Sequence, residues 1–197
     1  MPDNVFEIIY LIGLVIGSTM RGIYTVGRGR REVTSTRHGG LDTTLTALSG
    51  VGLLMLPLVC VFSSWLDFAA YAMPAGLAWV GAPVFAGAIV LLWRAHVDLG
   101  AHWSPTPETL ADHTLVTTGV YRYVRHPMYA AHYLWGIAQV LLLHNYVAGP
   151  AFLACYIPFL LVRIPREEAM MHERFGDAYR DYVTHTGRIF PQLKQSA

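Results

Sequence analysis

Five long apolar runs, separated by short polar connections, most constrain how this chain can fold. They are Val5 to Met20, Thr43 to Trp65, Ala75 to Arg94, Tyr129 to His144 and Gly149 to Arg163. As helices rising about 1.5 Å per residue, the second and third are long enough to cross about 30 Å of hydrocarbon, and the first only just. The last two are shorter, at roughly 22–24 Å, and flank the turn HNYVAG. Only 14% of the residues are charged, whereas soluble domains have about 25%.

We therefore predict an all-α integral membrane protein with about five transmembrane helices, the last two forming a short hairpin. Pro57, Pro83 and Pro158 lie inside apolar runs and predict kinks, because proline removes a backbone donor. The net charge of +1 gives no support to a nucleic-acid partner. Cys60 and Cys155 lie inside apolar runs, which favours small buried side chains over a disulfide or metal framework.

The positive charges predict how the chain lies in the membrane. The 14 Lys and Arg residues all follow the first, third or fifth run, so five crossings place them on one side. By the positive-inside rule this side is the cytoplasm, with the N-terminus outside and the C-terminus cytoplasmic. They are Arg21, Arg28, Arg30, Arg31, Arg37, Arg94, Arg122, Arg125, Arg163, Arg166, Arg174, Arg180, Arg188 and Lys194. The stretch VGRGRREVTSTRHGG is either a loop that sets topology or a contact for anionic lipid head groups.

The segment after the fifth run predicts a cytoplasmic amphipathic helix. PREEAMMHERFGDAYRDYVTHTG begins with Pro165 and ends with Gly187, which suit a helix start and stop. Its apolar side chains recur at helical spacing and form one stripe. The stripe consists of Met171, Phe175, Ala178 and Tyr182. We expect this helix to lie against the cytoplasmic helix ends or along the lipid interface.

Polar and aromatic residues gather where the fourth run begins, in the stretch YRYVRHPMYAAHY. Pro127 favours the first turn of a helix, which places His126 near its cap. The free N–H groups there and the helix dipole attract anions, and Arg125 adds a full charge. Tyr121 and Tyr129 add hydroxyls and aromatic faces. The stretch therefore suits a ligand with an anionic group and a flat or cationic part, although arginine and tyrosine also serve as plain interfacial anchors.

A second charged cluster follows the fifth run. Arg163 ends that run, and Glu167 and Glu168 come directly after Pro165. Arg163 and Glu167 share a face only if the helix continues through Pro165. Both clusters lie at the open end of one helical hairpin, so we expect them to be neighbours in space. The alternative is that the acids only complement the dipole of a first helical turn.

Together the two clusters resemble a known family. LVTTGVYRYVRHPMYAA followed by REEAMMHERFGDAYRDY is similar to the isoprenylcysteine carboxyl methyltransferases, over roughly residues 95–191. Phospholipid N-methyltransferases share much of the pattern. The resemblance implies a membrane enzyme that transfers a methyl group from S-adenosylmethionine, leaving S-adenosylhomocysteine. The acceptor would be the carboxylate of an isoprenylcysteine or a similar lipid-linked thioether acid.

The resemblance also implies an organisation and a set of site residues. Residues 1–94 would form an N-terminal three-helix membrane region, and residues 95–197 a catalytic region with cofactor segment, hairpin and tail helix. Arg163 and Glu167 would face the reacting group on the cytoplasmic side. The cofactor-binding residues implied are Leu115, Val116, Gly119, Tyr121, His126, Tyr129 and Glu168.

Two acceptor chemistries and one non-catalytic role stay open at this point. A carboxylate acceptor needs alignment rather than a base. Arg163 would hold the carboxylate with two parallel N–H groups, and Glu167 would orient Arg163. A phospholipid amine needs a base, for which Glu167 or Glu168 would serve. A lipid-binding protein without catalysis would bind no cofactor. The histidines are scattered, so no metal site is expected, and the sequence carries no signal for oligomeric state.

Overall fold

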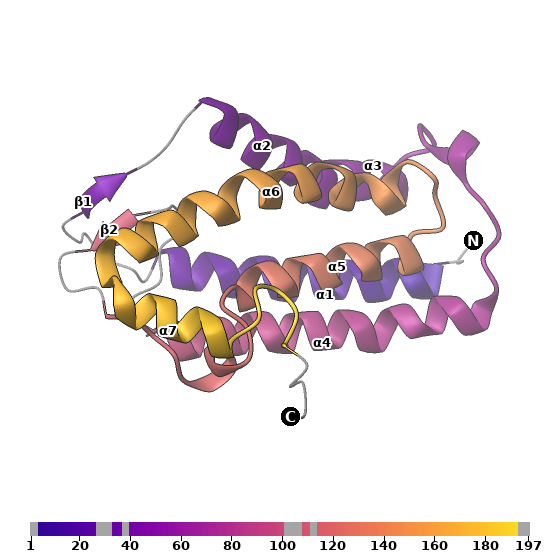
Figure 1. The fold of residues 1–197 in the computed structure, drawn as a ribbon. Coiled ribbons are helices and arrows are strands. Elements are labelled where there is room, and N and C mark those ends of the chain that lie inside the picture. The colour runs from indigo at the N-terminus through magenta and orange to yellow at the C-terminus, as the bar shows by residue number, and fades with distance from the viewer. Residues whose placement is uncertain (1–3, 27–32, 37–39, 101–107, 111–113, 193–197) are drawn as a thin grey trace.

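The computed structural model describes residues 4–26, 33–36, 40–100, 108–110 and 114–192, and its helices lie side by side with their long axes aligned (Figure 1). A small antiparallel ribbon at one end joins β1 (Val33–Thr36) to β2 (Glu108–Leu110), with an irregular register between Val33 and Ser35. The helices are α1 (Asn4–Val26), α2 (Gly40–Gly50), the π-helix η1 (Val51–Met55), α3 (Leu56–Phe62), the 3-10 turn η2 (Asp67–Ala69), α4 (Ala75–Leu99), the 3-10 turn η4 (Gly119–Arg122), α5 (Pro127–Leu142), α6 (Ala148–Phe175) and α7 (Asp177–His185).

Four helical segments of the described chain are long and apolar enough to cross a membrane: Val5–Thr25, Gly40–Phe62, Ala75–Leu99 and Ala148–Phe175. The second is the continuous succession of α2, η1 and α3. Helix α5 begins at Pro127, as the sequence predicted, but its 16 residues measure only about 24 Å. The chain is thus an integral membrane protein, with four helical segments that are candidate spans and one shorter apolar helix beside them (Figure 1).

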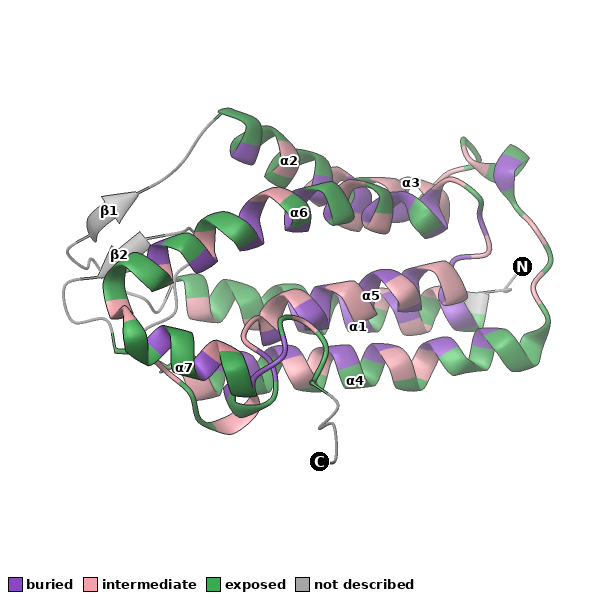
Figure 2. Ribbon diagram, viewed as in Figure 1, coloured by how far each residue is buried: buried purple, intermediate pink, exposed green. Residues whose placement is uncertain are grey.

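The outer faces of these helices are apolar. Figure 2 shows exposed residues along the outward sides of the bundle and buried ones between the helices. Large exposed apolar side chains include Ile12, Val15, Ile16, Trp79, Val90, Trp93 and Leu161. Such a surface is stable in hydrocarbon, whereas in water it would be a large unpartnered patch.

Helix α1 packs through two glycines one turn apart. A Cβ at Gly13 would collide with the ring of Phe85 on α4, and one at Gly17 with the ring of Trp135 on α5. Both rings are almost fully buried and belong to the main core cluster. Lipid tails are as apolar as side chains, so close packing on small residues is what holds membrane helices together.

Pro57 produces the one change of helix type within the second span. Because proline has no N–H, one carbonyl of the preceding turn loses its donor, and residues Val51–Met55 form a π-helix. Two carbonyls of this π-helix are satisfied by other helices. Gln139 Nε2 of α5 donates to Gly52 O at 3.0 Å, and the Tyr10 hydroxyl of α1 lies 3.1 Å from Leu53 O. A buried carbonyl needs such a partner in a membrane.

Close approach at Gly52 gives a first prediction. A Cβ there would lie 2.7 Å from Ala151 O and 2.9 Å from the Cα of Phe152, so Gly52→Ala forces η1 away from α6. We expect the unfolding free energy in detergent to fall by about 1–3 kcal/mol, measured by thermal or denaturant unfolding. Gly50→Ala is the control, since its added Cβ meets no atom within 4 Å. Equal stability of the two variants would contradict this packing.

The predicted tail helix is wrong in where it begins. Helix α6 continues through Pro158 and Pro165 to Phe175. It ends at Gly176, whose φ is +52°. An ion pair spans Pro165, joining Arg163 and Glu167 one turn apart. The break resets the helical phase, so Tyr179 and Tyr182 are buried in α7.

The predicted apolar stripe therefore fails at one position. Ala178 is exposed, whereas Tyr179 next to it is 1% exposed. The reason is that the stripe assumed one continuous helix across Gly176.

Candidate active site

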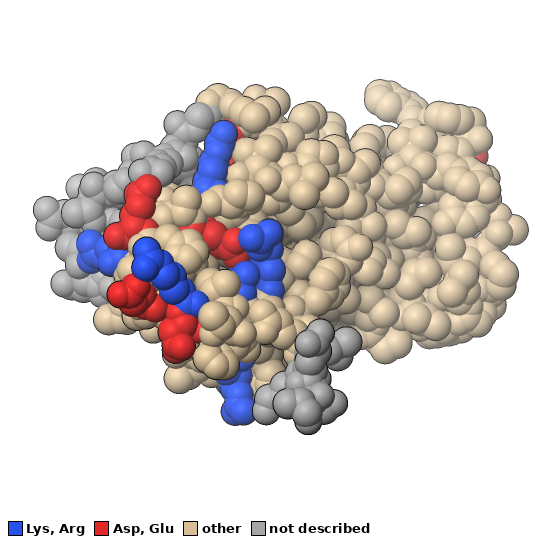
Figure 3. Space-filling view, viewed as in Figure 1, with Lys and Arg blue, Asp and Glu red and all other residues tan. Residues whose placement is uncertain are grey.

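Charged side chains gather at one end of the molecule. On the face in Figure 3 they lie around the C-terminal end of α6 and α7, and the other half of that face is almost free of charge. This fits the predicted one-sided distribution for the arginines that the structure describes. Arg28, Arg30, Arg31, Arg37 and Lys194, and with them most of the glycine–arginine stretch, lie outside the described residues.

The segment before α5 is fixed to α4 at a glycine turn. Gly119 has a φ of +61°, and a Cβ there would collide with the Asp98 carboxylate. That carboxylate accepts from the Val120 N–H at 2.8 Å and from Arg94 at 2.7 Å. A positive φ and the lack of space both require glycine here. Leu115 and Val116 lie in the irregular, half-buried segment just upstream, outside the ion-paired cluster.

Two tyrosines continue this anchoring. The Tyr121 hydroxyl donates to Ala95 O at 3.3 Å, and the Tyr182 hydroxyl of α7 donates to Tyr121 O at 2.5 Å. Burial raises the pKa of Tyr121 above its usual range and the pKa of Tyr182 to about 12. Both hydroxyls therefore stay protonated and able to donate at neutral pH.

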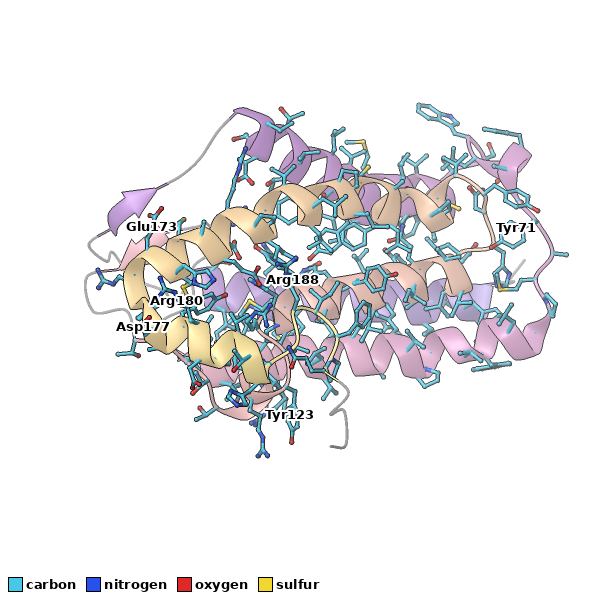
Figure 4. The ribbon with its side chains drawn as sticks, in the orientation of Figure 1. Tyr71, Tyr123, Glu173, Asp177, Arg180 and Arg188 are labelled. Carbon is cyan, nitrogen blue, oxygen red and sulfur yellow. The ribbon has the colours of Figure 1, made fainter. Side chains whose placement is uncertain are left out.

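The C-terminal segment docks against the same stretch. The Arg125 N–H donates to Gly187 O at 2.8 Å, and the His126 N–H to Arg188 O at 2.9 Å. In return the Gly187 N–H donates to Tyr123 O at 3.2 Å. Figure 4 labels Arg188 where this segment runs beside α6. Residues from both ends of the C-terminal half thus line one site.

Glu168 lies in a buried cage of cations. Its carboxylate accepts from Arg125 Nε at 3.1 Å and from Arg188 Nη2 at 2.5 Å. His126 Nε2 lies 3.4 Å from Oε1, and the side chains of Glu168 and Arg125 are only 10% and 8% exposed. Arg125 also donates to the backbone carbonyl of Thr186. Glu168 therefore ties together the start of α5, α6 and the C-terminal segment.

Glu167 joins the two clusters that the sequence predicted to meet. Its Oε1 accepts from the Tyr129 hydroxyl at 2.5 Å and from Arg163 Nε at 2.9 Å. Because α6 is unbroken at Pro165, Arg163 and Glu167 share a face. The same arginine donates through Nη1 to Asp42 Oδ2 at 3.3 Å. A single guanidinium thus faces two carboxylates.

Sequence reasoning missed Asp42, Arg188 and Arg21. Asp42 is 3% exposed at the start of α2, and its position at the membrane end of an apolar run was the available signal. Arg188 was counted only for topology, because its distance along the chain from Glu168 hides their contact. Arg21 Nη1 lies 3.2 Å from Nε2 of the buried His132.

The site chemistry fits a small ligand with polar and flat parts. The buried His126 Nε2 makes no hydrogen bond of good geometry among the described residues, and the His126 ring stacks on Tyr129 at 5.5 Å between centroids. Tyr129 in turn packs edge-on against Phe159, and Arg163 lies over that Phe159 ring. Within the described part of the chain, no group of three or more His, Cys, Asp or Glu is arranged to hold a metal ion.

An apolar pocket lies elsewhere, on another face of α5. Its volume is about 320 Å³, and it is lined by α4, α5 and the C-terminal segment. Ala130, Tyr133 and Leu134 face this pocket, whereas Tyr129 and His132 belong to the polar side of α5. The pocket is thus separate from the ion-paired cluster.

Fold and site together define a helical membrane protein with a buried, ion-paired polar site at the charged end of its bundle. Residues 79–173 match the isoprenylcysteine carboxyl methyltransferase (ICMT) family. The protein-S-isoprenylcysteine O-methyltransferase of Schizosaccharomyces pombe is 42% identical over 36% of this chain and 30% of its own length. The corresponding protein of Dictyostelium discoideum is 29% identical over 65% of this chain and 56% of its own length.

A solved structure adds similarity of fold. The eukaryotic intramembrane Ras methyltransferase ICMT superposes with a TM-score of 0.55 at 29% identity, covering 79% of this chain and 53% of that one. The matched region of this chain is similar to the isoprenylcysteine carboxyl methyltransferase family in sequence, and much of the chain is similar to this solved structure in fold. The chain spans only about a third to a half of the length of these relatives.

Proposed function

We propose that this protein is a membrane methyltransferase that uses S-adenosylmethionine to methylate the carboxylate of an isoprenylcysteine or a similar lipid-linked thioether acid. The observation that carries the proposal is the contact between Tyr129 and Glu167. It joins the R-H-P-x-Y turn to the glutamate pair, the two motifs on which the family resemblance rests. Both lie inside the region that matches the family.

The cofactor would lie against the glycine turn, the start of α5 and the glutamate helix. His126 offers a buried nitrogen whose contact with Glu168 is not a hydrogen bond of good geometry, and the aromatic face of Tyr129 suits a sulfonium by cation–π attraction. Both oxygens of Glu168 already accept from arginines, so Glu168 would act by orienting Arg125 and His126. The residues we assign to cofactor binding are Leu115, Val116, Gly119, Tyr121, His126, Tyr129 and Glu168.

The bound cofactor supplies an electrophilic methyl group, so that a C–O bond forms to the carboxylate as the S–C bond breaks with its electron pair left on sulfur. A carboxylate is already ionised, so no base is needed, and positioning of the two groups supplies about 7–11 kcal/mol of the barrier. Arg163 would place positive charge beside the acceptor. Glu167 and Asp42 fix its guanidinium, and the surrounding helices exclude water.

The phospholipid amine alternative is less well supported by this geometry. An amine acceptor must lose a proton, which requires a carboxylate free to accept it. Glu167 already accepts from Tyr129 and Arg163, and Glu168 from Arg125 and Arg188. Each carboxylate pairs with an arginine, and protonation would weaken that ion pair, which favours an acceptor that needs no base.

For topology we propose five crossings, with α5 as the short one. The N-terminus would then lie outside, and the C-terminus and the active site would lie on the cytoplasmic side. The support is the alternating direction of α1, α2–α3, α4, α5 and α6 along the bundle (Figure 1), with charge gathered at one end (Figure 3). The positive-inside rule assigns that end to the cytoplasm.

The test is cofactor binding followed by acceptor choice. We expect S-adenosylhomocysteine to bind the purified protein in detergent by isothermal titration, and His126→Ala to weaken it about tenfold through loss of a buried hydrogen bond. His185→Ala is the control, because His185 is exposed on α7. With labelled cofactor, N-acetyl-S-farnesylcysteine should be methylated and phosphatidylethanolamine should not. Absence of cofactor binding would leave only the lipid-binding role.

A further inference from the structure

Arg21 is an exposed arginine on α1 whose guanidinium reaches a buried histidine of α5, and the proposed reaction assigns it no role. It lies on α1, outside the region that matches the family. Its side chain turns inward, and Nη1 lies 3.2 Å from Nε2 of His132, which is 6% exposed on α5. An arginine near a helix end ordinarily extends toward the membrane surface. The inward contact is therefore a feature that needs explanation.

The partner of Arg21 is neutral. His132 Nδ1 lies 2.8 Å from Met128 O, so that nitrogen carries the proton and donates. Nε2 is then the acceptor for the guanidinium, which leaves the ring uncharged. Among the described residues no carboxylate pairs with Arg21. A guanidinium has five N–H donors. Among the described residues, the Arg21 side chain contacts one acceptor, His132 Nε2.

Tyr156 presents an unengaged hydroxyl beside this cation. Its side chain is 4% exposed, and its Oη has no hydrogen-bond partner among the described residues. The ring is held between Phe152 and Phe159, at centroid distances of 4.7 and 5.5 Å, and lies 5.9 Å from the His132 ring. A buried hydroxyl without a partner is costly unless a ligand satisfies it.

Packed aromatic rings connect Tyr156, beside Arg21, with Arg163 and Tyr129 of the proposed active site. Phe159, which stacks on Tyr156, packs against Tyr129 and lies under Arg163. Arg163 itself faces two carboxylates, Asp42 and Glu167, which offset its positive charge. A second anion would be repelled there unless another cation balances it.

We propose that Arg21 and the Tyr156 hydroxyl bind the acceptor's carboxylate, with His132 orienting Arg21. The proposal rests on the proposed function, because it names the groups that hold that function's substrate. Arg163 is already paired with Asp42 and Glu167. Arg21 therefore supplies the positive charge that pairs with the carboxylate of the acceptor. Arg163 then serves to position Glu167 and Tyr129 at the active site. The site binds the carboxylate of the substrate more tightly than the uncharged ester of the product.

The experiment measures ester discrimination in the full-length protein, without cofactor. N-acetyl-S-farnesylcysteine and its methyl ester are titrated into the detergent-solubilised protein, and their dissociation constants are compared. The wild type should bind the carboxylate about 10- to 100-fold more tightly than the ester, as expected for a charge-assisted hydrogen bond. Arg21→Gln should bring the ratio close to one, and Tyr156→Phe should lower it several-fold. Arg21→Lys, which keeps the charge, should retain part of it.

The control is Arg166→Gln, which removes the same charge from an exposed position on α6. It should leave the ratio unchanged. S-adenosylhomocysteine affinity should be the same in all these variants, so a general loss of folding is detected independently. If Arg21→Gln unfolds, Tyr156→Phe and Arg21→Lys still decide the question.

Two results would overturn the assignment. One is full carboxylate preference in Arg21→Gln or Tyr156→Phe. The other is competition by phosphatidic acid as strong as that of the carboxylate probe, which would make the site one for lipid phosphate. Failure of the wild type to bind S-adenosylhomocysteine would overturn the proposed function alone, because the carboxylate-to-ester ratio is read without cofactor.

Discussion

Glu167→Gln should lower the rate of methyl transfer by about 100-fold, with S-adenosylhomocysteine still bound. The neutral amide no longer balances the charge of Arg163, and its oxygen is a weaker acceptor than the carboxylate Oε1, which accepts from both Tyr129 and Arg163. The guanidinium would then shift toward Asp42. A displacement of about 1 Å in a positioning group can cost about 100-fold in rate. Turnover of N-acetyl-S-farnesylcysteine with labelled cofactor measures the effect.

Glu173→Gln is the matched control, because Glu173 is an exposed acid on the same helix (Figure 4). It should keep near-normal turnover. Arg163→Ala should be as inactive as Glu167→Gln, and the double variant no worse than either, since the two residues act as a unit. Retained turnover in correctly folded Glu167→Gln would remove this residue from the mechanism.

Glu168→Ala should destabilise the fold more than any other single exchange at the site. It leaves Arg125 buried without its carboxylate and releases Arg188 from α6. Breaking a buried ion pair by removing one partner costs about 3–5 kcal/mol. Because the Arg188 side chain is 55% exposed, we expect the lower part of this range. Unfolding in detergent followed by circular dichroism measures it.

Asp177→Ala gives the contrast. Asp177 pairs with Arg180, but the side chains are 93% and 71% exposed, and such pairs contribute about 0–1 kcal/mol. Similar losses for the two variants would mean that the Glu168 cage is no more than a surface ion pair. Both side chains of the control pair are visible in Figure 4.

The apolar runs and the start of α5 were predictable because their signals are local. Length and hydropathy define the spans, and Pro127 sets a helix start from its own geometry. Contact between Tyr129 and Glu167 also followed from the sequence, since a hairpin brings its two open ends together. The wrong start of the tail helix has a local cause as well. The sequence pattern predicts a helix start at Pro165, whereas α6 passes through Pro165 and ends before Gly176.

The remaining site residues could not be predicted, because their contacts join distant parts of the chain. Arg163 and Asp42 are 121 positions apart, and Arg21 and His132 are 111 positions apart. Periodicity and motif spacing report on neighbours within one element or one hairpin. The pairing of α1 and α2 with the hairpin depends on which helix faces pack together, which no local pattern specifies. The N-terminal helices, which the sequence marked only as hydrophobic, therefore supply two charges to the site.

Pro57, in the second span, has no backbone N–H, and this affects which side chains of other helices contact the span. Within a bilayer no water reaches the carbonyls of the turn before Pro57, so one that lacks a backbone donor needs an amide or a phenol on another helix at the same depth. Only a chain carrying Gln139 and Tyr10 at matching heights meets that demand. The turn before this proline is thereby joined to α1 and α5 by polar contacts as well as by packing.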